Sequence, residues 1–152
     1  MNIVFEKNQL THEPNMPITL PYKPRILIVE DDISLEPIWD YAVRQFNTQA
    51  SYVWVTSGKA ADNAYMTQLE IGRPFDLVIS DIFLSDQQTG IDLWEKYAHL
   101  LDGRFILTSE IEPSRLSRYL HQHAGNPTYL RKPLDPHQCV DAIYFALSER
   151  SA

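Results

Sequence analysis

Polar side chains follow four of the short apolar segments in this sequence. Glu30 and Asp31 come directly after RILIV, and Asp81 comes directly after FDLVIS. Thr108 ends RFILT, and Lys132 follows TYLR. If these segments are strands of one open α/β sheet, the polar side chains meet at one rim, because functional groups gather at the carboxyl ends of such strands.

This set of side chains is suited to accepting a phosphoryl group. Clustered carboxylates repel one another unless a cation lies between them, and Mg²⁺ prefers oxygen ligands. A carboxylate can also act as a nucleophile and form an aspartyl-phosphate. Lysine supplies a compact positive charge to the phosphoryl oxygens, and a threonine hydroxyl can donate to another of them. Phosphoryl transfer needs little beyond such positioning and charge neutralisation.

Each of these pieces has a plainer interpretation when taken alone. An acidic pair after a strand often caps the next helix, and we expect Asp32 to do so before Ile33. A single aspartate after a strand is commonly a turn residue, and Lys132–Pro133 alone would indicate only a turn. The prediction therefore rests on finding all four pieces at four strand ends in a consistent order.

The elements that would position these residues alternate along the chain. Apolar runs predict five strands, at residues 25–29, 51–55, 75–80, 104–108 and 128–130. Amphipathic segments predict five helices, at residues 33–46, 59–71, 90–100, 113–123 and 136–149. Strands that alternate with helices in this way indicate a parallel sheet covered on both faces.

The length of 152 residues fits a single domain. Residues 1–24 contain four prolines and predict an extended N-terminal leader, so the domain is expected at residues 25–149. The sequence ends just after the fifth predicted helix, which favours a stand-alone domain without an effector domain.

Composition excludes several classes of function. The net charge of −7 disfavours a nucleic-acid-binding surface. No apolar run approaches the roughly 18 residues of a membrane helix, and no signal peptide is visible. The single cysteine, Cys139, recurs with apolar residues at helical spacing and is interpreted as a core thiol. These features predict a cytoplasmic protein that neither spans a membrane nor binds nucleic acid directly.

The segments RILIVEDD, FDLVISDIFL, FILTSE and YLRKP together resemble the receiver domains of two-component response regulators, over roughly residues 25–149. The resemblance implies a flavodoxin-like, doubly wound, five-stranded parallel sheet of order 2-1-3-4-5 with five helices. It also implies that Asp81 is the phosphoacceptor and a ligand of Mg²⁺. By the same resemblance, Asp31 is a direct metal ligand, Glu30 acts through water, and the backbone carbonyl of Phe83 completes the protein ligands.

The resemblance assigns the remaining site residues as well. Lys132 and Thr108 would contact the phosphoryl group, and the Lys132–Pro133 peptide bond would be cis. Thr108 and Tyr129 would form a switch that moves when the domain is phosphorylated. The loop after Asp81 departs from the family pattern, because many relatives have proline where Ser85 stands and Gly90 comes one residue later than usual.

The function implied is that of a response regulator phosphorylated by a sensor histidine kinase or a phosphotransfer protein. Residues 113–149 would form the output surface that contacts a downstream protein target. Such a domain catalyses only its own phosphorylation and dephosphorylation, so it is not an enzyme acting on a separate substrate. The oligomeric state is left open, with a homodimer as one option.

Two other functions are compatible with parts of this pattern. A phosphorylation-independent docking module would keep the fold and use the same surface constitutively, which leaves Asp81, Thr108 and Lys132 without a role. A phosphatase of the haloacid-dehalogenase type also forms an aspartyl-phosphate. That type requires a second aspartate two residues after the nucleophile, where Phe83 stands.

Overall fold

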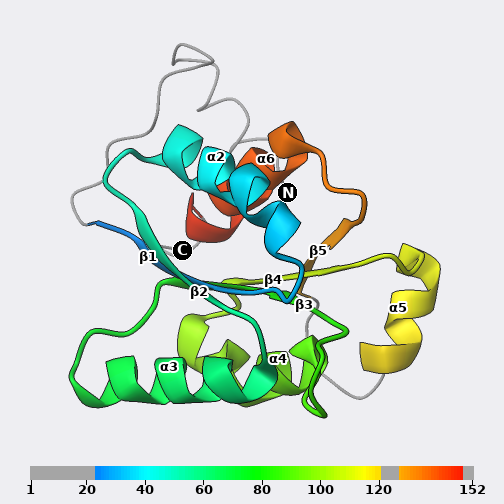
Figure 1. Ribbon diagram of the computed structural model, residues 1–152, viewed down its shortest axis with the longest axis horizontal. Coiled ribbons are helices and arrows are strands. Elements are labelled where there is room, and N and C mark those ends of the chain that lie inside the picture. Colours follow the sequence, from blue (N-terminus) through cyan, green and yellow to red (C-terminus); the bar gives the residue numbers. More distant parts are fainter. Residues whose placement is uncertain (1–22, 121–126, 149–152) are drawn as a thin grey trace.

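The computed structural model describes residues 23–120 and 127–148, which form one five-stranded sheet with helices on both faces (Figure 1). The strands are β1 (Arg25–Val29), β2 (Ser51–Val55), β3 (Leu77–Asp81), β4 (Phe105–Ser109) and β5 (Thr128–Arg131). All neighbouring strands are parallel, in the order β2-β1-β3-β4-β5. The flavodoxin-like sheet predicted from the sequence is therefore confirmed.

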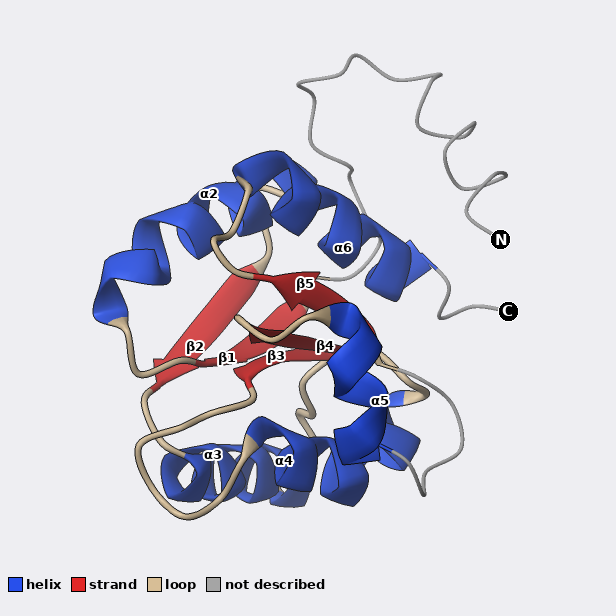
Figure 2. Ribbon diagram, turned by 90° about the vertical axis from the view of Figure 1, so that its right-hand side faces the viewer, coloured by secondary structure: helices blue, strands red, loops and turns tan. Residues whose placement is uncertain are grey.

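Helices cover this sheet in two layers. The α-helices are α2 (Glu36–Phe46), α3 (Gly58–Glu70), α4 (Gly90–Tyr97), α5 (Pro113–Leu120) and α6 (Pro136–Ser148), with 3-10 helices η1 (Ile33–Leu35) and η2 (Ala98–Leu101). Figures 1 and 2 show α2 and α6 on one face, α3 and α4 on the other, and α5 beside the β5 edge. Among the described residues, no helix has the length and apolar character needed to cross a membrane.

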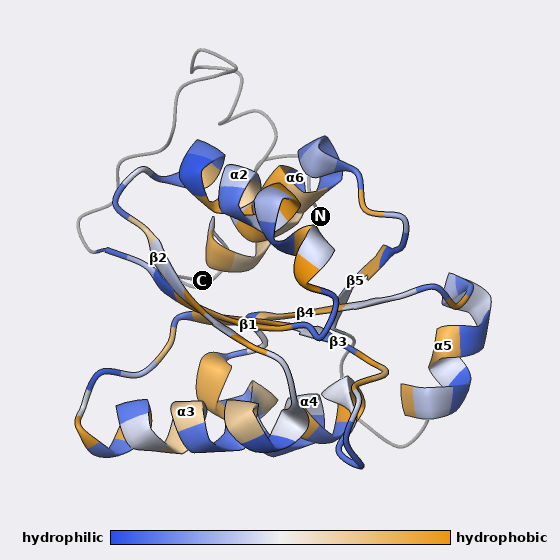
Figure 3. Cartoon of the chain, in the orientation of Figure 1, coloured by the Kyte–Doolittle hydropathy of each residue, from blue (hydrophilic) through white to orange (hydrophobic). Residues whose placement is uncertain are grey.

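The core lies between the sheet and each helical layer, as the hydrophobic colouring of Figure 3 illustrates. Successive strand residues point to opposite faces. Leu27 and Val29 of β1 therefore pack with the α3–α4–α5 layer, while Ile26 and Ile28 pack with the α2–α6 layer. Cys139 belongs to the second layer and is fully buried, which raises the pKa of its thiol to about 12 and confirms it as a core residue.

The first predicted helix begins differently from the expectation. Residues 33–35 form a 3-10 turn, and the α-helix begins only at Glu36. Pro37 lies in the first turn of α2, where its missing N–H is tolerated, so the helix begins just before it. The Asp32 carboxylate accepts the Ser34 backbone N–H at 3.1 Å, which confirms the predicted capping role.

The bounds of other strands and helices also differ from those predicted. The third strand begins at Leu77 rather than at Phe75. Just before it, Asp76 exchanges two hydrogen bonds with the Arg25 backbone: its N–H donates to the carbonyl at 2.7 Å, and its carboxylate accepts the N–H at 2.8 Å. Phe75 is nevertheless buried, so its apolar character predicted burial but not strand pairing. The fourth strand begins one residue later than predicted, at Phe105, and the predicted 90–100 helix tightens into η2 after Tyr97.

Two expectations concern segments outside the described residues. The extended leader was expected at residues 1–24, of which the structure describes only residues 23 and 24. The fourth predicted helix was expected to reach residue 123, and α5 is described as far as Leu120.

Gly90 lies against the end of β3. A Cβ atom at position 90 would lie 2.2 Å from the backbone oxygen of Asp81 and 2.9 Å from the Ser80 hydroxyl oxygen. The Gly90 N–H also donates to the Ile82 carbonyl at 2.8 Å, and Thr89 caps α4 through a reciprocal capping box with Asp92. Only glycine allows α4 to begin so close to the strand that carries Asp81.

Replacing this glycine tests the close approach. We expect Gly90→Ala to lower the free energy of unfolding by about 3 kcal/mol, at the upper end for overpacking, because the clash is with backbone. Gly72→Ala is the control: no atom lies within 4 Å of its added Cβ, and its cost is only that of a positive φ, about 1–2 kcal/mol. Urea unfolding measures both variants, and a Gly90→Ala protein as stable as wild type would contradict the packing argument.

Candidate functional site

The carboxyl ends of four strands meet at one rim and carry the predicted residues. Glu30 follows the last residue of β1, and Asp81 is itself the last residue of β3. Asp81 lies opposite Thr108 in the register of β3 with β4. Lys132 follows the last residue of β5 and is anchored there by its backbone N–H, which donates to the Ser109 carbonyl at 2.7 Å.

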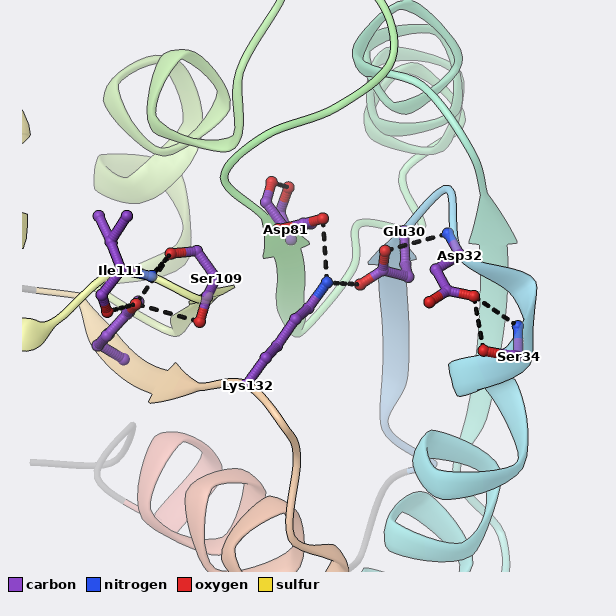
Figure 4. Close-up of polar contacts among 9 residues, drawn as sticks. Glu30, Asp32, Ser34, Asp81, Ser109, Ile111 and Lys132 are labelled. Carbon is purple, nitrogen blue, oxygen red and sulfur yellow. Dashed lines mark hydrogen bonds and ion pairs between the residues drawn. The ribbon is translucent and has the colours of Figure 1, made fainter.

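Lys132 lies between two buried carboxylates (Figure 4). Its ammonium nitrogen is 3.0 Å from Oε1 of Glu30 and 3.1 Å from Oδ2 of Asp81. The Glu30 and Asp81 side chains are only 2% and 9% exposed, so both ion pairs are shielded from solvent. The other oxygen of Glu30 accepts the Asp32 backbone N–H at 3.1 Å. Both carboxylate oxygens of Glu30 are thus engaged by the protein.

The rim carries more negative than positive charge. Oxygen atoms of Glu30, Asp31 and Asp81 lie within 4.8 Å of one another, and Asp31 is exposed to solvent. Lys132 is the cation that pairs with this group among the described residues. Three carboxylates and one ammonium leave two negative charges, which are costly at a partly buried position.

Burial and the neighbouring charges shift the pKa values of this group. Burial, and then repulsion by Asp81, raises the pKa of Glu30 to about 7, although the bond from Lys132 opposes the shift. Burial also raises the pKa of Asp81 against the opposing charge of Lys132. Burial alone would lower the pKa of Lys132, but the bonds to Glu30 and Asp81 outweigh it and raise that pKa.

The donor set fits a hard divalent cation. All three groups offer carboxylate oxygens, the ligands that Mg²⁺ prefers, and a double positive charge would match the excess at the rim. Phe83, the residue predicted to add a backbone carbonyl, lies in the loop that follows β3. Its side chain is half-exposed and its ring makes an edge-to-face contact with Tyr119 of α5, with ring centroids 6.1 Å apart.

Tyr129 is held more firmly than the sequence suggested. Its ring is partly buried and packs against the core. Its hydroxyl donates to the Ile111 carbonyl at 2.6 Å and lies 2.9 Å from the Ser109 hydroxyl. The sequence did not predict these contacts with Ser109 and Ile111, because no spacing rule connects the two residues with a tyrosine in a later strand. The Lys132–Pro133 bond is cis, as expected.

The sequence and the fold are similar to those of known signalling proteins, although no family model matches the chain. Response regulator protein PmrA of Pseudomonas aeruginosa is 33% identical over 113 residues, which is 73% of this chain. This chain spans about half, 47%, of the length of that curated relative.

Solved receiver domains have the same fold. The non-phosphorylated HemR receiver domain from Leptospira biflexa superposes with a TM-score of 0.62 at 26% identity, over 83% of this chain and 95% of that one. A CheY-like response regulator receiver domain protein from Methanospirillum hungatei superposes with a TM-score of 0.67 at 23% identity, over 86% and 98%. This chain therefore carries a receiver domain of the response-regulator family.

Proposed function

We propose that Asp81 accepts a phosphoryl group in a Mg²⁺-dependent reaction and that the domain acts as a phosphorylation-controlled signalling switch. The observation that carries the proposal is the charge at the rim. Two buried carboxylates share one lysine next to a third, exposed carboxylate, which leaves room in the charge balance for a divalent cation. A receiver domain is a signalling module, so no separate substrate is turned over.

The chemistry follows from these groups. A carboxylate oxygen of Asp81 would attack the phosphorus of a phosphohistidine, forming a P–O bond as the P–N bond breaks, and the imidazole would leave with the N–P electron pair and take up a proton. Lys132 is already within 3.1 Å of Asp81 and would move its contact to a phosphoryl oxygen. Thr108, opposite Asp81, would supply a hydroxyl donor.

We assign the metal to Asp31, Asp81 and the Phe83 carbonyl, with Glu30 acting through water. Both oxygens of Glu30 already bond to Lys132 and Asp32, which favours an indirect role, while exposed Asp31 can approach a hydrated ion directly. When bound, Mg²⁺ would neutralise the carboxylates and the negative charge of the incoming phosphoryl group.

The proposed phosphodonor is a sensor histidine kinase or a phosphotransfer protein. The proposed output is a change in the surface formed by α5, β5 and α6, which a downstream protein would recognise. The likeness to response regulator PmrA supports this role, since two-component signalling is the setting in which such proteins receive phosphoryl groups. A phosphorylation-independent docking module is the second candidate. A docking module would not require an excess of carboxylates over lysine at the rim.

Phosphorylation of Asp81 can be tested directly. Incubation with acetyl phosphate and Mg²⁺ should label the wild-type protein, and mapping of the adduct should find Asp81 alone. We expect Asp81→Asn to abolish labelling, because the amide is a poor nucleophile. Asp40→Asn should be labelled like wild type, since Asp40 lies on α2 and pairs with Arg44. Full labelling of Asp81→Asn would contradict the assignment, and a wild-type protein that is not labelled at all would favour the docking module.

Metal binding should stabilise the protein in a pH-dependent way. Burial raises the pKa of Glu30 from its usual 4.5 to about 7. Protonated Glu30 therefore contributes its whole share of the free energy of unfolding below about pH 4.5, and this share is lost as the pH rises through about 7. Because Mg²⁺ offsets the carboxylate charge, we expect it to raise the Tm more at about pH 8 than at about pH 6.

Two adjacent variants make the metal assignment specific. Asp31→Asn should remove most of the Mg²⁺-induced increase in Tm, because a direct ligand is lost. Asp32→Asn is the matched control, since Asp32 is also exposed but bonds to Ser34 instead. Thermal unfolding with and without Mg²⁺ measures both. An Asp31→Asn protein that responds like wild type would overturn the assignment.

Thr108 and Tyr129 should transmit the phosphorylated state. We expect Thr108→Ala still to accept phosphate at Asp81 but to lose much of the change in α5 and β5 that beryllofluoride induces. Tyr129→Phe removes the hydroxyl and with it the bonds to Ser109 and Ile111. The part of the change that comes from breaking or exchanging these bonds should therefore be lost. Amide NMR shifts with and without beryllofluoride test this, and a full wild-type pattern in Thr108→Ala would exclude it as the switch.

A further inference from the structure

The loop that leads from Asp81 to α4 is fastened to a helix elsewhere in the sequence. This β3–α4 loop comprises residues 82–89. Asp86, near its middle, accepts the Gly58 backbone N–H at 3.0 Å and the Lys59 N–H at 2.9 Å through its two carboxylate oxygens. Gly58 begins α3, so the carboxylate satisfies two free donors at the positive end of that helix. The bonds from Gly58 and Lys59 hold the pKa of Asp86 below its usual value.

A second attachment lies beside the first. The Gln88 side-chain amide donates to Asp62 of α3 at 3.0 Å, and Asp62 also accepts Lys96 and Tyr97 of α4. The loop, α3 and α4 thus share one polar cluster.

The fit of the loop against α3 depends on glycine at position 58. A Cβ there would lie 2.5 Å from Cβ of Gln88, so a larger residue would push the loop away. Within the described chain, the carbonyl oxygen of the Gln88 side chain is buried without a hydrogen bond. That unpaired oxygen disfavours the position of Gln88, so other contacts must hold the loop there.

The attachment reaches back to the acidic rim. The helix that Asp86 caps follows β2, which ends at Val55. The Val55 carbonyl accepts the Glu30 backbone N–H at 2.9 Å. Hydrogen bonds and short stretches of chain therefore connect Asp86 through α3 and β2 to Glu30, and the loop itself connects Asp86 to Asp81. Glu30 and Asp81 are therefore connected both through Lys132 and through the loop, α3 and β2.

We propose that Asp86 is a positioning residue that, by capping α3, holds the β3–α4 loop in the conformation that lets Phe83 and Asp81 bind Mg²⁺ together. This inference rests on the proposed function, because it assigns a role in the metal site to a residue that does not touch it. Phe83 lies between the fixed end of β3 and Asp86, so the position of its carbonyl depends on both ends of this short segment.

The experiment compares two ways of removing a cap from the same helix. Asp86→Ala removes the carboxylate that reaches α3 from the loop. Ser57→Ala removes the N-cap that α3 supplies itself, since the Ser57 hydroxyl accepts the Ala60 N–H at 3.1 Å. Both should lower stability to a similar extent. We expect only Asp86→Ala to weaken Mg²⁺ binding, by about fivefold, the factor that corresponds to about 1 kcal/mol.

Further readouts separate positioning from stability. In metal-free protein, the Phe83 amide resonance should move in Asp86→Ala and stay near its wild-type position in Ser57→Ala. Gly58→Ala, which displaces the loop through Gln88 without removing a charge, should weaken Mg²⁺ binding as Asp86→Ala does. Equal Mg²⁺ affinity in wild type and Asp86→Ala, measured by isothermal titration calorimetry, would overturn the positioning role.

Failure of this inference can be told apart from failure of the proposed function. Wild type and Asp81→Asn are measured beside the variants with Mg²⁺ and acetyl phosphate. If wild type is labelled at Asp81 and Asp86→Ala binds Mg²⁺ equally well, only the positioning role is wrong. If wild type neither binds Mg²⁺ nor is labelled, the proposed function fails and the role of Asp86 fails with it.

Discussion

The placement of one lysine between two buried carboxylates is the constraint on which the rest of the site depends. Lys132 reaches Glu30 and Asp81 at 3.0 and 3.1 Å, and the three residues follow or end three different strands. A buried charge without a partner is costly, so these strand ends must remain in register for the protein to stay folded. The order β2-β1-β3-β4-β5 satisfies this requirement, because it places the end of β3 between those of β1 and β4.

The same arrangement leaves the site with uncompensated negative charge. Lys132 compensates only part of the negative charge, and burial together with repulsion by Asp81 raises the pKa of Glu30 to about 7. A site with fully balanced charges would gain little from a cation or a phosphoryl group. The remaining negative charge favours binding of a cation, and the cation in turn favours binding of a phosphoryl group. The surrounding backbone hydrogen bonds keep the carboxylates from moving apart.

Much of this arrangement could be predicted from the sequence, for reasons that particular residues make clear. The runs that became β1 and β2 were predicted to the residue, because apolar and β-branched residues end abruptly at polar ones. Asp81 and Lys132 could be placed together because strand ends share a rim. Contacts that depend on tertiary structure could not be found in this way. Asp86 is 28 residues from Gly58, and no spacing rule links a loop carboxylate to a distant helix end. The bonds of Tyr129 to Ser109 and Ile111 escaped prediction for the same reason.

The hydrogen bond from the Gly90 N–H to the Ile82 carbonyl closes the β3–α4 loop at its base. The Ile82 N–H is in turn bonded to the Thr108 carbonyl at 2.9 Å, so the first residue after Asp81 is fixed by the sheet itself. Both ends of the loop are therefore fixed by backbone hydrogen bonds, independently of the side chains between them. The base of the loop therefore maintains the geometry of the acceptor, and the two bonds of Asp86 to α3 hold the stretch between the two ends of the loop.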